Sequence, residues 1–397
     1  MNPIQKRIEM MNQRVTDLQQ GGLYFYLQPL EELDDAWVTT GGRRMLNFAS
    51  YGYLGLLGHP KIDAAAQEAV AQYGSGTHGV RILAGTLPLH NELEQTIARF
   101  KKAEAAIVYS SGYVTNLATV SSLLGRNDIV ICDKFNHASI VDGCLLSHAK
   151  LLRFHHNDMA SLEQRLQQAD PDVGKLVIVD AVFSMDGDII NLPEVSRLCR
   201  EYDAMLMVDE AHSLGVLGEK GYGIEEHFGL EEVIDVKMGT LSKTIPSVGG
   251  YIAGDQELIT YLKHASRAFV FSAALPPAQV AAATASFEVI EDEPKRVKKL
   301  QRNIKLFLGG LKELGFDTLD SETPIVPIIC GEDERAYQMA KLCQEEDIFV
   351  LPVVSPAVPA GLARLRANVT AAHSEEDITH ALDIFEQAGK ETGVLDK

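Results

Sequence analysis

The chain has 397 residues, of which 46% are hydrophobic and 23% are charged, and its formal net charge is -19. This length exceeds what one hydrophobic core usually serves, so it predicts a large and a small domain, and the composition excludes a disordered protein. The acidic excess argues against a nucleic-acid-binding protein, because such proteins neutralise phosphates with Lys and Arg.

The amino-terminal residues carry no signal for secretion or for a membrane. Residues 1–20 are polar and charged, with no apolar run able to act as a signal peptide or a membrane span. The five cysteines lack C-x-x-C spacing, so neither a zinc site nor a disulfide framework is indicated. We therefore expect a cytoplasmic protein without a transmembrane segment. Residues 1–50, broken by two Gly-Gly pairs, are interpreted as an arm that joins the small domain or a neighbouring subunit.

Residues 51–290 alternate apolar runs of strand length with helical patterns. This alternation implies crossover connections and predicts a large α/β domain with a mostly parallel sheet. In such sheets ligands bind outside the carboxyl ends of the strands, where Asp133, Asp180 and Asp209 stand, so we expect the site there. The predicted strands are 106–109, 129–132, 175–179, 205–208 and 233–238.

After Pro276 and Pro277 the pattern changes to long helices, from about 278 to 310. Residues 291–397 are therefore expected to form a smaller α+β domain at the carboxyl terminus. Its predicted elements are strands at 325–329, 349–351 and 363–367, followed by a helix at 374–387.

Two residues near the fourth predicted strand fit a pyridoxal phosphate site. Asp209 follows an apolar run, and a carboxylate in that setting needs a cationic partner, such as a protonated ring nitrogen, to stay ionised. His212, three residues on, can hydrogen-bond the phenolic oxygen of the same ring. The alternative for Asp209 is an aspartate that caps the next loop, and His212 alone could be an ordinary loop histidine.

Lys243 completes the pattern. It follows the hydroxyl residues Thr240 and Ser242, which suit a phosphate, and it precedes Gly249 and Gly250, which let the backbone approach closely. A partly desolvated lysine can hold the cofactor as a Schiff base. The order of Asp209, His212 and Lys243 is more specific than any of them alone.

Two further segments are candidate cofactor contacts. His137 follows the predicted strand 129–132 and opens a helical pattern, so its ring can stack on the cofactor; the alternative is a helix-start histidine without a ligand. Ser111, Gly112 and Tyr113 lie between a strand and a helix, where a glycine turn with free amides is an anion site suited to the phosphate. Arg366 alternates in a strand-like run and could face solvent, but a bidentate guanidinium is what an amino-acid carboxylate needs.

Two other motifs are judged not to be sites. Residues 74–79 match G-x-G-x-x-G, but a helical pattern rather than a strand precedes them, so a dinucleotide fold is not expected. His155 and His156 with Asp158 could suggest a metal. Adjacent histidines point apart and no second cluster is evident in the sequence, so no metal is expected.

Taken together, the motifs resemble those of the α-oxoamine synthase family of fold-type I pyridoxal phosphate enzymes, and the resemblance covers nearly the whole chain. The family implies a decarboxylative condensation of a small amino acid with an acyl thioester, of coenzyme A or an acyl carrier protein, to an α-amino ketone. The motifs are NFASYGYLG at 47–55, GT at 85–86 with His90 and ELE at 92–94, NHAS at 136–139, FSMDGD at 183–188, VDEAH at 208–212, GTLSK at 239–243 and TAAH at 370–373.

The resemblance also implies roles for matching positions and a homodimer with the active site shared at the subunit interface. Ser272 is expected to contact the cofactor phosphate, whereas Ala274 stands where many relatives have a hydroxyl, which puts a second contact there in doubt. The other implied roles are Lys243 as the cofactor-bearing lysine and general acid/base, Asp209 on the ring nitrogen, His212 on the phenolic oxygen, His137 stacked on the ring, Ser184 and Thr240 in the polar shell, and Arg366 on the substrate carboxylate.

Members of the family differ in amino acid and acyl donor, and two local features disagree about them. Ser50 and Tyr51 resemble the serine palmitoyltransferase branch, whereas Val80, before Arg81, resembles the glycine acetyltransferase branch and is expected to line the side-chain pocket. Tyr51 and the apolar run 23–27 favour a medium to long acyl chain and a serine palmitoyltransferase-like enzyme. Glycine C-acetyltransferase and 8-amino-7-oxononanoate synthase, which joins alanine to a pimeloyl thioester, remain the alternatives.

Two rivals come from outside the family reaction. A fold-type I aminotransferase uses the same lysine and aspartate, and formation of pyridoxamine phosphate in a half-reaction would distinguish it. A non-catalytic subunit is the other, and the presence of Lys243 argues against it.

Overall fold

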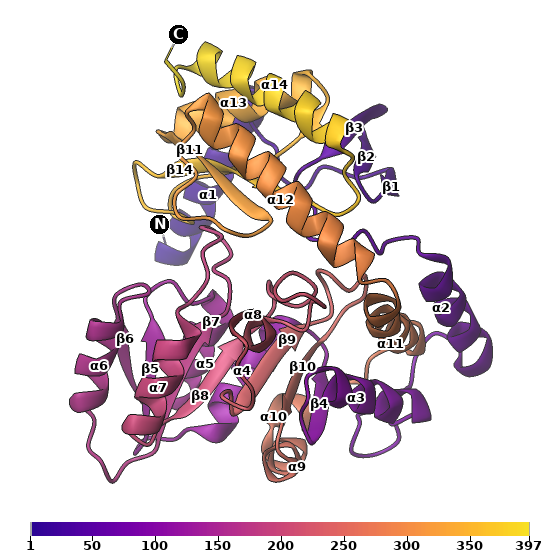
Figure 1. The fold of residues 1–397 in the computed structure, drawn as a ribbon, viewed down its shortest axis with the longest axis vertical. Coiled ribbons are helices and arrows are strands. Elements are labelled where there is room, and N and C mark those ends of the chain that lie inside the picture. Colours follow the sequence, from indigo (N-terminus) through magenta and orange to yellow (C-terminus); the bar gives the residue numbers. More distant parts are fainter. Residues whose placement is uncertain (1, 397) are drawn as a thin grey trace.

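The computed structural model describes residues 2–396, which fold into two halves separated by the loops that carry the candidate site (Figure 1). The lower half in Figure 1 is built on a seven-stranded sheet, and the upper half contains a three-stranded sheet under long helices. This confirms an α/β domain with a smaller α+β domain. The boundaries proposed at residues 50 and 290 stay predictions.

The large sheet has the strand order β4-β10-β9-β8-β7-β5-β6. Pairs β6–β5, β5–β7, β7–β8 and β8–β9 are parallel, and β10 is antiparallel to both of its neighbours. All five predicted strands are present. The strands are β4 (Ala105–Tyr109), β5 (Ile129–Asp133), β6 (Lys150–Phe154), β7 (Lys175–Asp180), β8 (Met205–Asp209), β9 (Val236–Thr240) and β10 (Gly250–Gly254).

Two strands of this sheet were not predicted. β6 lies at the edge, and its residues are mostly half-buried or exposed, so its apolar signal is weak. β10 begins at Gly250, which the sequence analysis had expected only to let the backbone approach closely. Gly250 is needed there because a Cβ would lie 2.8 Å from Cα of Gly112, and the strand is buried throughout.

Both faces of the large sheet are buried, which explains its continuous apolar runs. In β5, Ile129 and Ile131 belong to one core, while Val130 and Cys132 belong to the other. Helices α4, α5 and α9 supply the second core; α3, α6, α7 and α11 supply the first. The helices of this half are α2 (Pro60–Tyr73), α3 (Pro88–Phe100), α4 (Gly112–Leu123), α5 (Ala138–Ser147), α6 (Met159–Gln167), α7 (Leu192–Glu201), α8 (Ile224–Phe228), α9 (Gln256–Ala265), α10 (Arg267–Val270) and α11 (Pro277–Asp292).

The small half contains an antiparallel sheet of order β11-β14-β13. The long helices expected over 278–310 are α11 and α12, because α11 ends before Pro294 and α12 begins after it. Its elements are α12 (Lys295–Leu314), β11 (Ile325–Gly331), α13 (Asp333–Glu345), β13 (Pro352–Val353), β14 (Ala363–Asn368) and α14 (Glu375–Thr392).

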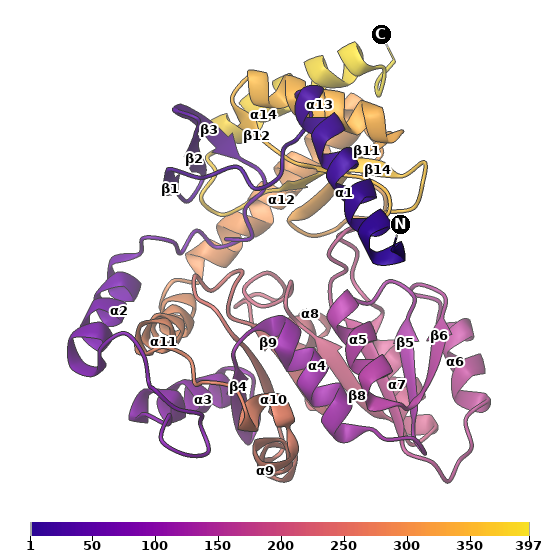
Figure 2. The same ribbon diagram turned by 180° about the vertical axis from the view of Figure 1, so that it is seen from behind.

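The amino-terminal arm packs on the small half, which is one of the two alternatives expected for it (Figure 2). Strand β3 pairs in parallel with β12 (Ile348–Phe349), so the predicted strand at 349–351 joins the arm instead of the small sheet. No helix among residues 2–396 combines the length and the hydropathy needed to cross a bilayer. The arm consists of α1 (Pro3–Gln20), β1 (Glu32–Asp34), β2 (Trp37–Thr40) and β3 (Arg43–Asn47).

Candidate active site

Three buried carboxylates lie at one edge of the large sheet, as the sequence predicted. Asp133, Asp180 and Asp209 are the last residues of β5, β7 and β8, and Asp180 pairs in register with Asp209. Burial, together with the charge of Asp209, raises the pKa of Asp180 well above its usual value. The edge therefore concentrates negative charge in a region of low dielectric.

Asp209 has hydrogen bonds but no cationic partner. Its Oδ2 accepts from Nδ2 of Asn116 at 2.7 Å, and its Oδ1 accepts from the amide of Ala211 at 2.9 Å. The residue is 4% exposed, and none of the ion pairs among residues 2–396 includes it. A buried carboxylate that lacks a cationic partner is suited to bind a protonated ring nitrogen.

Lys243, His212 and Tyr53 form a hydrogen-bonded row beside Asp209. Nζ of Lys243 lies 2.8 Å from Nε2 of His212, and Nδ1 of His212 lies 2.7 Å from the Tyr53 hydroxyl. Burial lowers the pKa of Lys243 to about 8, although Asp209 opposes the shift. Burial and the charge of Lys243 hold the pKa of His212 well below its usual value. A lysine of this kind is partly neutral near neutral pH, as a Schiff-base amine or a general base must be.

His137 stands at the start of α5. Its backbone amide donates to Oδ2 of Asp180 at 3.1 Å, and its Nδ1 lies 2.7 Å from the Ser139 hydroxyl. Burial lowers the pKa of His137, so its flat ring is neutral and available for stacking.

The start of α4 and the end of β9 form a cradle suited to an anion. The Ser111 hydroxyl caps the helix by accepting from the amide of Val114 at 3.2 Å. A Cβ at Gly112 would meet Oγ1 of Thr240 at 2.8 Å, so only glycine allows this approach. Oγ1 of Thr240 lies 2.9 Å from the Ser242 hydroxyl. Hydroxyls and free helix amides together fit a phosphate.

Tyr113 lies at the mouth of this cradle and is 44% exposed. Its hydroxyl donates to Asp142, and its ring meets that of His137 edge-on with centroids 6.3 Å apart. Tyr113 is thus next to His137, and the phosphate role expected for Ser111, Gly112 and Tyr113 stays a prediction.

Arg366 reaches the site from β14 of the small half. Its Nε donates to the backbone oxygen of Ser184 at 2.6 Å, and its Nη1 donates to Oδ1 of Asn368 at 3.1 Å. Its Nη2 is buried without a hydrogen-bond partner. The guanidinium carbon lies 4.9 Å from the centre of the Tyr51 ring, and Nζ of Lys243 lies 5.9 Å from the same ring. A buried donor without an acceptor, next to Lys243, fits a substrate carboxylate.

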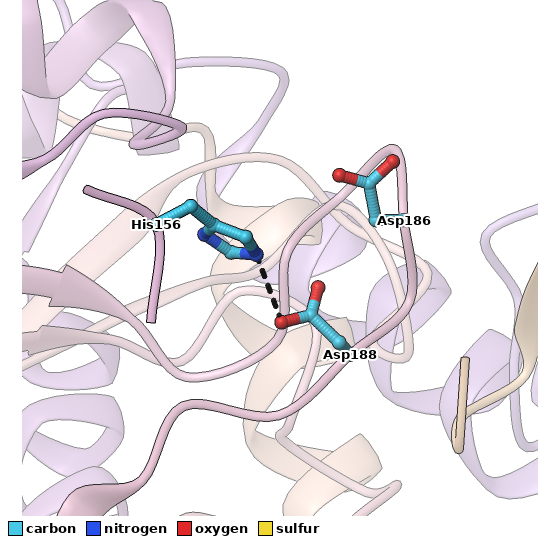
Figure 3. A group of neighbouring side chains, drawn as sticks. All are labelled: His156, Asp186 and Asp188. Atoms are coloured by element: carbon cyan, nitrogen blue, oxygen red, sulfur yellow. Dashed lines mark hydrogen bonds and ion pairs between the residues drawn. The ribbon is translucent and has the colours of Figure 1, made fainter. Parts of the chain in front are cut away.

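The loop that carries Ser184 is held by an ion cluster that the sequence did not reveal (Figure 3). His156 lies 3.0 Å from Oδ1 of Asp133 through Nδ1 and 3.0 Å from Oδ2 of Asp188 through Nε2. Arg364 pairs with Asp186 and donates to the backbone oxygen of Met185 at 2.9 Å. The expectation that no second cluster accompanies His156 is therefore wrong, because its partners come from the distant segment 186–188.

This cluster is an ion-pair network by its geometry. Burial disfavours the charge of His156, but the two carboxylates outweigh that effect and raise its pKa to about 10. The side chains of His156, Asp186 and Asp188 have ligand atoms within 4.8 Å of one another. Asp186 is already paired with Arg364, and both ring nitrogens of His156 are bonded to carboxylates.

A cavity of about 630 Å³ adjoins the site at Ser184. This volume is in the range of small-molecule sites. Its wall mixes apolar and charged side chains. The cations are Lys134, Arg364 and His156, and the carboxylates are Asp186, Asp188, Asp320 and Glu322. The apolar lining residues include Phe135, Phe183, Ile189, Leu319, Val358 and Leu362.

Three features that the sequence placed at the site lie outside this group of side chains, namely Val80, Ser272 and the run 23–27. Val80 forms an isolated β-bridge with Ala273, which is next to Ser272. No hydrogen bond among residues 2–396 joins Val80 or Ser272 to Lys243. The pocket-lining role of Val80 and the phosphate contact of Ser272 stay predictions. The run 23–27 does not line the cavity, because Phe25 packs in the core and Leu27 is 90% exposed. It gives no support for a long acyl chain.

Sequence reasoning gave no role to two residues that the structure brings to the site. Asn116 lies one helical turn after Gly112, and this spacing could have indicated that it shares the face of α4 toward Asp209. Tyr53 is in the motif 47–55, but nothing in the sequence links it to His212, which is 159 residues away.

The comparisons with known proteins agree with this geometry. Residues 43–385 match the family described as aminotransferase class I and II. The chain is 45% identical over 381 residues to the 8-amino-7-oxononanoate synthase of Thermosipho melanesiensis, covering 96% of this chain and 97% of the relative. It is 43% identical over 378 residues to the serine palmitoyltransferase of Sphingobacterium spiritivorum, covering 94% and 95%. The structure of the S. paucimobilis serine palmitoyltransferase with bound PLP-myriocin aldimine superposes with a TM-score of 0.96 at 34% identity, covering 100% of both chains.

Proposed function

Because the chain belongs to the aminotransferase class I and II family and, within it, to the α-oxoamine synthases, we propose that it condenses a small amino acid with a medium- or long-chain acyl thioester. The chain is a pyridoxal phosphate-dependent acyltransferase-type enzyme. The observation that carries the proposal is the pairing of Arg366, with its free buried Nη2, and Lys243 around Tyr51.

The cofactor, when bound, supplies an electron sink for the α-carbon of the amino acid. Lys243 would hold it, Asp209 would keep its ring nitrogen protonated, and His212 would donate to its phenolic oxygen. His137 would stack on the ring. The phosphate would lie among Ser111, Gly112, Tyr113, Thr240 and Ser242, with Ser184 nearby and Ser272 from the partner subunit.

The protein side of the reaction is proton transfer and positioning. Arg366 orients the substrate carboxylate, and the neutral fraction of Lys243 takes the α-proton, because its pKa of about 8 is near the working pH. The α-carbon then attacks the thioester carbonyl, the thiol leaves, and the carboxylate departs as carbon dioxide. Lys243 returns the proton to give the α-amino ketone.

The apolar part of the cavity beside Ser184 supports a long acyl chain, as in a serine palmitoyltransferase-like enzyme. That part is formed by side chains such as Phe135, Phe183 and Leu362, and the cavity reaches Ser184, whose backbone oxygen accepts from Arg366. The thiol carrier would be coenzyme A or an acyl carrier protein, and the enzyme would work as a homodimer in the cytoplasm. The five cysteines are all free and buried, which suits a reducing compartment.

A second candidate is 8-amino-7-oxononanoate synthase, which uses alanine and a pimeloyl thioester. Lys134 in the cavity wall favours it, since a pimeloyl chain ends in a carboxylate that needs a cation. The 45% identity to the Thermosipho 8-amino-7-oxononanoate synthase also supports this second candidate.

The test is a matrix of glycine, alanine and serine against acetyl, pimeloyl and palmitoyl thioesters, with thiol release and product mass measured. We expect release with a long-chain donor, and none from Lys243→Ala, which should still fold. Preference for pimeloyl with alanine would establish the second candidate. Transamination of an amino acid without thiol release would overturn both.

A further inference from the structure

Tyr53 has no part in the chemistry above, yet its hydroxyl is buried beside it. The residue is 0% exposed, and the hydroxyl lies 2.7 Å from Nδ1 of His212. The Arg366 guanidinium also acts on the Tyr53 hydroxyl, as a donor toward its oxygen, so His212 is the acceptor available among residues 2–396 for the hydroxyl hydrogen. Because a buried hydroxyl hydrogen without an acceptor is unfavourable, the hydrogen points at Nδ1.

The direction of that bond fixes the other ring nitrogen of His212. Burial keeps His212 neutral, so one nitrogen accepts and the other donates. If Nδ1 accepts from Tyr53, Nε2 carries the proton and donates to Nζ of Lys243 at 2.8 Å. An amine can accept only when it is neutral, since an ammonium group has no lone pair.

The opposite direction of hydrogen bonding through Tyr53, His212 and Lys243 is disfavoured. A charged Lys243 would donate to Nε2, Nδ1 would donate to the Tyr53 oxygen, and the hydroxyl hydrogen would be left unpaired in the interior. Arg366 cannot accept the hydroxyl hydrogen of Tyr53. Its charge acts on Tyr53 strongly enough to oppose the burial effect on the tyrosine pKa, but a guanidinium only donates.

We propose that Tyr53 is a positioning residue that acts through His212 to keep the Lys243 amine neutral and ready to take the substrate proton. The same bond presents the Nε2 hydrogen of His212 as a fixed donor toward the cofactor. This inference rests on Lys243 being the acid/base group, as proposed above.

The other groups that act on Lys243 are known, so the contribution of Tyr53 can be separated from them. Asp209 on β8 and Asp180 on β7 favour the charged amine, while Arg366 on β14 disfavours it. His137 at the start of α5 and the Tyr51 ring complete the surroundings. Tyr53→Phe removes one hydroxyl and leaves all five groups in place.

The experiment compares wild-type and Tyr53→Phe holoenzymes. We expect the acid limb of the kcat profile to move up by roughly one pH unit, so that kcat at pH 7 falls about tenfold, while KM for the amino acid stays within about twofold. The absorption band of the bound cofactor, titrated without substrates, should shift its midpoint upward as well. Fluorotyrosine at position 53, a stronger donor, should move both midpoints down.

The matched control is Tyr337→Phe on α13, which removes another buried tyrosine hydroxyl, 3.5 Å from that of Tyr26. It should leave both midpoints unchanged. Unshifted midpoints in Tyr53→Phe and in the fluorotyrosine protein, or an equal shift in Tyr337→Phe, would overturn the proposal. The band is read without an acyl donor, so a wrong assignment of the substrates leaves this result intact.

Discussion

At the scale of single residues, the chemistry of this site comes from burial combined with a few directed charges. Lys243 is pushed toward its neutral form by burial, while Asp209 is kept ready for a cation by having hydrogen-bond donors but no ion-pair partner. The two side chains are 34 positions apart in the chain, and neither is unusual by type. Asp209 ends the buried strand β8 and Lys243 lies in the loop after β9, and these buried positions make them reactive.

Asp209→Asn tests the electrostatic role of this carboxylate. Removing the negative charge should lower kcat by two to three orders of magnitude, roughly 3–4 kcal/mol, because the ring nitrogen would lose its stabilising partner. Steady-state kinetics with the preferred substrates measure the effect. Asp235→Asn is the control, since Asp235 accepts from the amide of Leu206 at the opposite end of β8; near-normal turnover in Asp209→Asn would show that the pocket is misassigned.

Val80→Ser tests the choice of amino acid. If Val80 narrows the side-chain pocket, the wild type should prefer glycine or alanine to serine. The variant should raise kcat/KM for larger amino acids relative to that for glycine, by a factor equivalent to about 1–3 kcal/mol. The acyl donor is held fixed in the assay. A wild type that prefers serine, or an unchanged ranking in the variant, would favour the resemblance of Tyr51 to serine palmitoyltransferase.

At the scale of elements, the loop after β7 connects the two halves of the site. Residues 183–188 are held on one side by His156 and on the other by Arg364, and the same loop offers the Ser184 oxygen to Arg366. The position of the Arg366 guanidinium, which we propose binds the substrate carboxylate, therefore depends on an ion cluster that lies outside the group around Lys243.

The stability of the His156→Gln variant, measured as a function of pH, tests this ion cluster. The pKa of His156 is about 10 in the folded chain and about 6.5 when unfolded, so its stabilisation is complete below about pH 6.5 and is lost as the pH rises toward 10. The variant should be less stable than wild type by about 3 kcal/mol at pH 6, with the gap closing by pH 10.

Urea unfolding midpoints at pH 6, 8 and 10 measure that gap. His227→Gln, at an exposed position of α8, is the control and should show no such trend. A constant difference between His156→Gln and wild type from pH 6 to 10 would mean that His156 is not charged in the folded protein.

At the scale of the whole molecule, catalysis requires both halves of the chain. Lys243 and Asp209 come from the large sheet, whereas Arg366 comes from the small one, so the relative placement of the halves sets the geometry around Tyr51 (Figure 1). The segments with Val80 and Ser272 carry exposed apolar side chains, with Leu83 at 82% and Phe271 at 75% exposure. Such side chains suit a subunit interface.

Leu83→Asp should therefore weaken the proposed homodimer and lower activity in parallel. Sedimentation should give the wild type a mass twice that of the 43.5 kDa chain and shift the variant toward the monomer. Met205→Asp, at an exposed position at the start of β8, is the control. A monomeric wild type with full activity would rule out a shared active site.

The sequence by itself determined the fold class, the cofactor and the family, because these depend on local order: buried strands ending in Asp133, Asp180 and Asp209, and motifs that surround Lys243 and His212. It could not determine the pairing of β10 or the partners of His156. Those depend on segments far apart in the chain, such as Tyr53 with His212, or Arg364 with Asp186. Hydrogen bonds and ion pairs of this kind form only when the packed core brings distant side chains within about 3 Å, and no local pattern records that distance.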